Sequence, residues 1–312
     1  MSAVAEELTG GGGPVDEGVP AAEAPSGERR GLAGRLRPGA WPVRPSVVLA
    51  WAVLALVAVA ALWPGLLTDQ APDAADPLQA LAPPGSDHWF GTDQLGQDVY
   101  SRVAHGARYS LAAGLGATGL AIVVGAALGV LAATAGRAVD ELVMRVTDIL
   151  LAFPGLLLAL LVVAVLGPGS VHSTLAISAS MVPGFVRLAR AQALVIRDSD
   201  YVQAARVLGR SRTSVFLRHL LPNALPPVLV LATVGIGSAV IAGSSLSFLG
   251  LGPQPPAPEW GAMLSQGRDL LDISWAPAVF PGAAITLTVL AVNVVGRDLQ
   301  HRFEGRTAGG RH

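Results

Sequence analysis

The sequence predicts an all-α, polytopic membrane protein with about six transmembrane helices, and three observations support this class. Of its 312 residues, 52% are hydrophobic and only 14% are charged, whereas an ordinary soluble domain carries roughly 25% charged residues. The mean hydropathy is +0.53. Six apolar segments also approach the roughly 20 residues that a helix needs to cross a bilayer, and most of the charges lie between these segments.

The composition also excludes several kinds of site. The chain has no cysteine, which excludes disulfides and thiolate metal sites. All 21 basic residues are arginine. A phosphate-binding P-loop requires a lysine, so this chain contains none. If ATP drives its function, another subunit has to hydrolyse the ATP.

The first 45 residues are expected to form a disordered tail. Residues 1 to about 27 are rich in Gly, Ala, Glu and Pro and show no apolar periodicity. The first apolar run begins near Val47 and is too long for the apolar core of a cleavable signal peptide, so we expect no such peptide. An arginine-rich collar precedes this run and consists of Arg29, Arg30, Arg35, Arg37 and Arg44.

The first transmembrane helix is expected within 46–68, and five more follow in a core region over 108–299. The six apolar runs are Val47–Leu67, Tyr109–Ala135, Ile149–Leu166, Ser173–Leu188, Ala224–Leu246 and Trp275–Gly296. In the second run, Ala121, Gly125 and Gly129 have the small-residue spacing that allows two helices to approach closely.

The fourth run is the most polar of the six, because it contains Ser173, Thr174, Ser178, Ser180 and Pro183. Two interpretations remain open for these side chains. They could line a translocation path, or they could form hydrogen bonds that hold neighbouring helices together. We favour the second, because intramembrane Ser and Thr commonly bond across helices.

The arginines indicate the orientation of the chain. With the N-terminus inside, 18 of the 21 arginines fall in cytoplasmic segments. The exceptions are Arg102, Arg108 and Arg268. Since arginine and lysine accumulate in cytoplasmic loops, we expect both termini in the cytoplasm, an extracytoplasmic segment over 69–107 and a cytoplasmic tail over 300–312.

The cytoplasmic loop over 197–222 is basic and has the pattern of a helix, a glycine elbow and a second helix. Asp200 suits a helix N-cap, and Gln203 lies where it can complete a capping box. Gly209 suits the left-handed residue that ends a helix, and Pro222 is expected to stop the second helix. The loop is either a docking element or a helical hairpin without a partner.

This loop resembles the E-A-A-x-x-x-G…L-P loop of ABC importer permeases. The matching residues are Gln203, Ala204, Ala205, Gly209, Leu221 and Pro222. The resemblance implies a coupling helix that docks on the ATPase subunit, with Asp200, Arg206 and Arg212 in the same loop. Gln203 replaces the usual glutamate, which keeps a capping hydrogen bond but removes one negative charge.

Two outer segments resemble signatures of the dipeptide, oligopeptide and nickel branch of these permeases. The first contains Gly91, Thr92, Asp93, Gly96 and Asp98; the second contains Phe248, Gly250, Gly252, Pro255 and Trp260. From the residues alone, we favour turns and helix caps for the two aspartates over a cation site. Trp260 and Trp275 are expected in an interfacial aromatic belt.

The resemblance implies the pore-forming permease subunit of an ATP-driven importer in the bacterial plasma membrane. Its substrates would be peptides, nickel chelates or related solutes. The implied partners are ABC ATPase subunits, a second homologous permease, an extracytoplasmic binding protein and membrane lipid. We expect no enzyme activity, cofactor, metal or nucleic acid. The alternative is an ion-gradient-driven secondary transporter, although its expected ionisable group near the membrane midplane is missing from the predicted spans.

Overall fold

The structure, a computed structural model, describes residues 45–197, 199–207, 210 and 221–308. Within these ranges the secondary structure is helical and contains no strand, which confirms the all-α class. The expected tail, with its arginine collar, lies outside the described residues. The α-helices are α1 (Pro45–Leu62), α2 (Val99–Thr134), α3 (Arg137–Leu151), α4 (Gly155–Leu166), α5 (Ser170–Arg197), α6 (Asp200–Val207), α8 (Leu221–Phe248), α9 (Trp260–Arg268) and α10 (Ala276–Ala308). Two short 3₁₀ turns, η1 (Pro64–Leu66) and η2 (Pro77–Gln79), precede α2.

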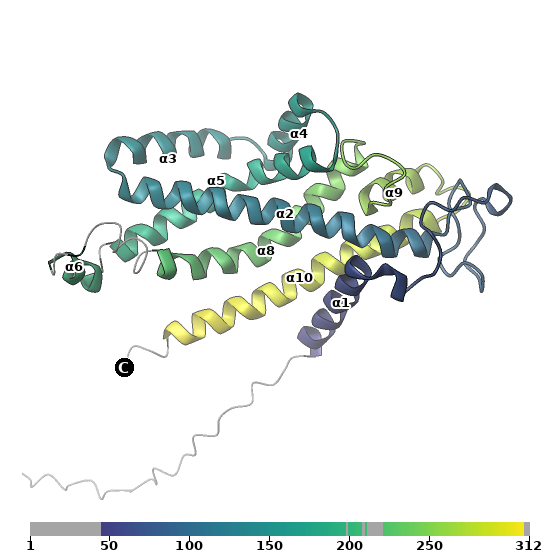
Figure 1. The fold of residues 1–312 in the computed structure, drawn as a ribbon, viewed down its shortest axis with the longest axis horizontal. Coiled ribbons are helices and arrows are strands. Elements are labelled where there is room, and N and C mark those ends of the chain that lie inside the picture. Colours follow the sequence, from purple (N-terminus) through teal and green to yellow (C-terminus); the bar gives the residue numbers. More distant parts are fainter. Residues whose placement is uncertain (1–44, 198, 208–209, 211–220, 309–312) are drawn as a thin grey trace, which may run out of the picture. The chain divides into compact units, whose positions relative to one another are not determined.

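Helices α2 and α5 lie side by side at the centre of the bundle, with α8 beside them (Figure 1). Small residues on α2 permit this contact. Ala121 is fully buried, and a methyl group added at Gly125 would lie 2.4 Å from the Cβ atom of Phe185. One added at Gly129 would lie 2.5 Å from the carbonyl oxygen of Val186. The predicted close helix contact at these three positions is therefore confirmed.

The third expected span is wrong as a single helix. Its sequence is divided between α3 and α4, which are bent by 96° relative to one another. Pro154 stands immediately before α4, and a proline disfavours helical geometry in the residue that precedes it. In the described part of the chain, four helices are long and apolar enough to cross a bilayer, or five if α3 and α4 form one span. The count of six spans stays a prediction.

Two expected boundaries also fall inside helices. Helix α2 begins at Val99, so residues 99–107 of the expected extracytoplasmic segment belong to it. Helix α10 continues to Ala308, past the expected end of the core at 299. Hydropathy locates the apolar part of a helix and does not detect polar turns at either end.

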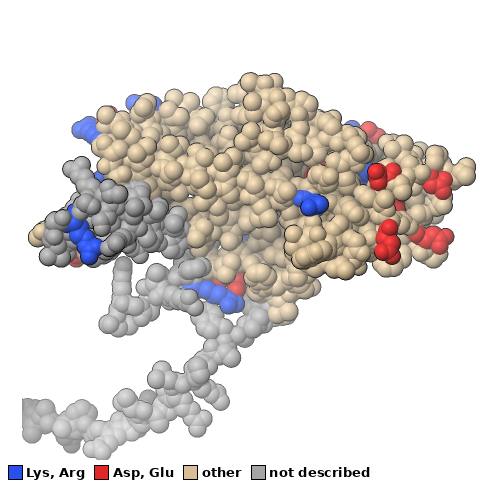
Figure 2. All heavy atoms as spheres, in the orientation of Figure 1, with Lys and Arg blue, Asp and Glu red and all other residues tan. Residues whose placement is uncertain are grey.

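Charged side chains lie mainly at the two ends of the bundle (Figure 2). Most of the visible carboxylates gather near the segment before α2, which contains Asp69, Asp73, Asp76 and Asp87. Arginines are visible near α3 and α6 at the other end, and a largely uncharged surface separates the two groups. This arrangement suits a protein whose middle section lies in lipid.

Candidate functional site

The first outer signature folds into a compact loop before α2. Gly91 and Gly96 have φ angles of +73° and +72°, which glycine adopts without steric cost. A methyl group at Gly96 would lie 1.8 Å from the carbonyl oxygen of Asp76. Between these glycines, Thr92 is fully buried. Its hydroxyl accepts the N–H of Ala82 at 2.8 Å and donates to the carbonyl of Gln79.

The two aspartates of this signature act as turn and cap residues. Asp98 caps α2 by accepting the backbone N–H of Ser101 at 2.7 Å, and its other oxygen lies 2.9 Å from Nδ1 of His88. Asp93 accepts the backbone N–H groups of Leu95 at 2.8 Å and Gln97 at 3.0 Å. The preference for turns and caps at these positions is confirmed.

The second outer signature forms the connection from α8 to α9. Gly250 has a φ of +78° and follows the end of α8. A methyl group at Gly252 would lie 1.9 Å from Oγ of Ser247. The Arg268 guanidinium lies over the ring of Phe248, 5.1 Å from the ring centroid. Pro255 is exposed in the connector. The signature thus fixes how the chain leaves α8.

The expectation for Trp260 is wrong, because this side chain is buried and not part of an interfacial belt. It is 1% exposed and belongs to a core cluster with Val99 and Met263. Its Nε1–H donates to the carbonyl of Val103 at 2.8 Å. Gly106 leaves room for the ring, since a methyl group there would lie 2.8 Å from Trp260 Cδ1.

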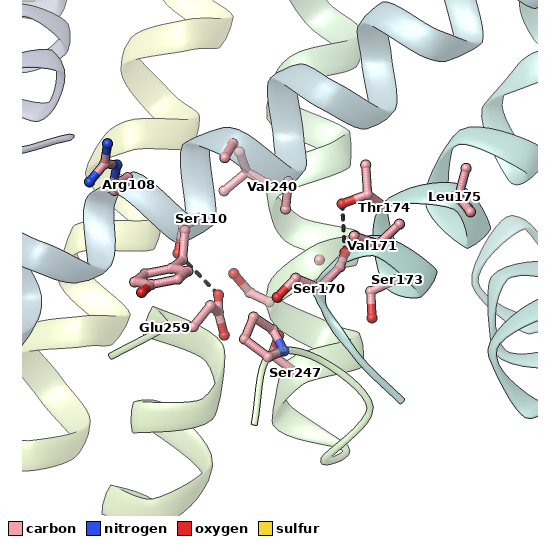
Figure 3. Close-up of a pocket in the computed structure, with 16 residues that line it drawn as sticks. Arg108, Ser110, Ser170, Val171, Ser173, Thr174, Leu175, Val240, Ser247 and Glu259 are labelled. Atoms are coloured by element: carbon pink, nitrogen blue, oxygen red, sulfur yellow. Dashed lines mark hydrogen bonds between the residues drawn. The ribbon is translucent and has the colours of Figure 1, made fainter. Parts of the chain in front are cut away.

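A cavity of about 530 Å³ lies between α2, α5, α8 and the segment that leads into α9 (Figure 3). Glu259 lines it and is 3% exposed. One carboxylate oxygen accepts the hydroxyl of Ser110 at 3.0 Å, and the other accepts the backbone N–H of Ala262 at 2.9 Å, capping α9. The sequence interpretation missed Glu259, although it is the only acidic residue between Asp200 and Asp269.

The polar residues of α5 include one that bonds to another element and two that bond within their own helix. The Ser173 hydroxyl donates to the carbonyl of Leu251 at 2.7 Å, which joins α5 to the α8–α9 connector. Thr174 and Ser180 donate to carbonyls of their own helix, those of Ser170 and Ile177. Ser173 and Thr174 also line the cavity described above, and their role in a translocation path stays a prediction.

Among the described side chains of α6, Val202 attaches the helix to the core. Val202 is fully buried in a cluster whose other members are Val130, Ala133, Ala193 and Ile196. These four residues belong to α2 and α5. Val207, at the end of α6, is 88% exposed. The helix therefore joins a buried anchor to an exposed apolar end.

The start of α6 differs from the expectation by one residue. Asp200 is the first helical residue, and the carbonyl of Ser199 accepts the N–H of Gln203 at 3.1 Å. Ser199 therefore holds the N-cap position, and Asp200 places its charge in the first turn, where the helix dipole favours it. Ala204, Ala205 and Arg206 lie within α6.

The rest of the coupling motif is only partly described. Gly209 and Arg212 lie outside the described residues, and with them the predicted elbow. Leu221 and Pro222 are the first two residues of α8. Pro222 therefore lies in the first turn of a long helix, where a proline is tolerated because backbone N–H groups there have no partner within the helix. The short helix expected before it lies outside the described residues.

Ion pairs join α3 to the C-terminal half of α5. Arg190 forms a two-point contact with Asp140, in which Nη2 lies 2.6 Å from Oδ2. Arg187 Nη2 lies 2.7 Å from Asp148 Oδ1. A bidentate guanidinium–carboxylate contact fixes orientation as well as distance. These contacts hold α3 against the helix that also anchors α6.

Comparison with known proteins places this architecture in a family. Residues 125–309 match the family described as binding-protein-dependent transport system inner membrane component. A probable D,D-dipeptide transport permease of Escherichia coli K12 is 40% identical over 85% of this chain and 89% of its own. A glutathione transport permease of Escherichia coli O6:K15:H31 is 44% identical over 72% of this chain and 75% of its own.

Solved structures show the same fold. An inward-facing methionine ABC transporter matches with a TM-score of 0.53 and 18% identity, over 64% of this chain and 95% of the other. An amino acid ABC transporter matches with a TM-score of 0.50 and 14% identity, over 64% and 94% of the two chains. The chain thus belongs to the binding-protein-dependent inner membrane components and is a multi-pass permease of the ABC importer class.

Proposed function

We propose that this permease translocates peptides or related small solutes that an extracytoplasmic binding protein delivers. The observation that carries the proposal is similarity over most of the chain to permeases named for D,D-dipeptide and glutathione transport. The absence of lysine supports a division of labour in which separate ATPase subunits hydrolyse ATP. Nickel chelates remain part of the predicted substrate range.

The position of α6 supports a mechanical role for the loop over 197–222. ATP-driven closure of the ATPase subunits would move the exposed end of α6, near Val207. Because Val202 is packed between α2 and α5, that movement would be passed to the two central helices as a rigid-body shift. At the contact between this loop and the ATPase subunit, Gln203 would lack the negative charge of the usual glutamate.

The proposal also includes orientation and assembly. Eighteen of 21 arginines lie in segments that an inside N-terminus would place in the cytoplasm, which supports cytoplasmic termini. By resemblance to its branch, a second homologous permease would complete the pore. Lipid would cover the remaining exposed apolar side chains, such as Val123 and Leu161.

The energy source separates this function from the alternative. In cells that carry the complete transport operon, we expect uptake of a radiolabelled dipeptide to stop when the ATPase genes are deleted. Uptake should continue when an ionophore collapses the proton gradient and ATP is maintained. The opposite pattern would identify a secondary transporter, and uptake that survives both treatments would identify an unpowered channel.

A further inference from the structure

The cavity between α2, α5 and α8 contains a buried carboxylate that forms no ion pair with a described residue. Glu259 is 3% exposed and accepts one hydrogen bond at each oxygen. Among the residues that the structure describes, none forms an ion pair with it. A buried carboxylate is normally paired with a cation or fully hydrogen-bonded, because burial removes its hydration. Each oxygen of Glu259 retains capacity for another donor.

A second polar group in the same cavity also lacks a partner. Ser244 lines the cavity and is 8% exposed. Its hydroxyl oxygen is buried and has no hydrogen-bond partner within the described part of the chain. Buried hydroxyl groups nearly always have a partner. Glu259 and Ser244 line this space from different elements, and each has hydrogen-bonding capacity that the described residues do not use.

The remaining walls suit a small organic ligand. Val171, Leu175 and Val240 line the space with apolar surface (Figure 3). Its volume of about 530 Å³ falls within the range of roughly 300–1,000 Å³ that is usual for ligand pockets. Arg108 also lines the cavity and is exposed. It carries a positive charge, opposite in sign to the carboxylate inside.

We propose that this cavity is an entry site for the free amino terminus of a short peptide. The ammonium group has three donors and would bind Glu259 and Ser244, and Arg108 would attract the terminal carboxylate. No group of three or more His, Cys, Asp or Glu side chains suited to a metal occurs in the described ranges, which favours an organic cation over a metal ion. This inference rests on the proposed peptide substrate and adds the group by which the permease recognises it.

The test measures binding of dialanine and N-acetyl-dialanine to the purified permease–ATPase complex without its binding protein, by saturation-transfer NMR. We expect the unmodified complex to bind dialanine at least tenfold more tightly than the acetylated probe, which lacks the ammonium. Glu259→Gln should reduce this preference to less than threefold. A purely structural role for Glu259 would weaken both probes equally and leave their ratio unchanged.

Two neighbouring serines on α8 provide a second test of the site and its control, without changing Glu259. Ser244→Val fills the cavity and removes an acceptor, so it should weaken dialanine binding at least fivefold. Ser245→Val changes a residue whose hydroxyl bonds to its own helix at Ile241 and which does not line the cavity, so it should bind dialanine as the parent does. Thermal melting would verify that each complex remains folded.

The inference is overturned if the unmodified complex binds neither probe or binds both equally, or if Ser244→Val and Ser245→Val behave alike. Uptake into cells is scored separately. If dialanine uptake requires the ATPase but the purified complex does not prefer dialanine over the acetylated probe, the cavity site is refuted and the proposed function stands. Selective binding without ATP-driven peptide uptake would refute the proposed function.

Discussion

Gly129→Leu is expected to prevent stable assembly of the helix bundle. A first side-chain carbon at this position would lie 2.5 Å from the Val186 carbonyl oxygen and 2.8 Å from the backbone nitrogen of Arg190. Both are backbone atoms of α5, so no rotamer change can relieve the overlap. Overpacking a core costs typically about 1–3 kcal/mol and occasionally more; with backbone on the opposing side, we expect about 3 kcal/mol or more.

The measurement is the yield and melting temperature of the detergent-purified protein. Gly119→Leu is the matched control, because Gly119 lies on the same helix and an added methyl group there meets no atom within 4 Å. We expect this control to purify and melt like the parent. Equal stability of the two variants would show that α2 and α5 do not approach as closely at Gly129 as the structure places them.

Trp260→Ala is expected to produce the second large effect. The ring is 1% exposed and its Nε1–H is bonded to the carbonyl of Val103. Removal of a buried tryptophan side chain leaves a large cavity and costs about 3–5 kcal/mol. The loss would loosen α9 from α2 and remove the side-chain donor of the Val103 carbonyl. Trp260→Phe should recover most of the packing but not the hydrogen bond.

Trp275→Ala is the appropriate control, since that tryptophan is 52% exposed. We expect its melting temperature to remain close to that of the parent, and that of Trp260→Phe to lie between the parent and Trp260→Ala. If the two alanine variants were equally stable, Trp260 would lie at an interface, as the sequence alone suggested.

The sequence was sufficient for the helical class and for the closest helix contact, because both depend on local patterns. Apolar length identifies helices of the membrane-spanning kind. The spacing of Ala121, Gly125 and Gly129 predicts one face of small residues. The preference for turns and caps at Asp93 and Asp98 follows from the residue type and the neighbouring glycines. Each of these properties requires only neighbours in the chain.

Other features depend on contacts between distant residues. The burial of Trp260 results from Gly106, more than a hundred residues earlier, which leaves room for its ring. The role of Glu259 depends on Ser110, 149 residues away. Hydropathy cannot reveal the 96° bend between α3 and α4, because the apolar run from Ile149 to Leu166 continues from the end of α3 through Pro154 into α4. Contacts of this kind require the tertiary arrangement.

The most direct test of the central claim is cross-linking from the end of α6. The chain contains no cysteine, so a Val207→Cys variant carries a single thiol, at a position that is 88% exposed. A Leu78→Cys variant carries one at a position that is 96% exposed, in the expected extracytoplasmic segment. Each variant would be labelled with a photoreactive maleimide in the assembled transporter and then illuminated.

We predict a covalent adduct between the Val207→Cys permease and an ATPase subunit, with a yield that changes when ATP is bound. The Leu78→Cys variant should label equally well and give no ATPase adduct. If the Val207→Cys variant labels but never cross-links within an intact complex, or is accessible only from outside the cell, then α6 does not couple this permease to ATP hydrolysis.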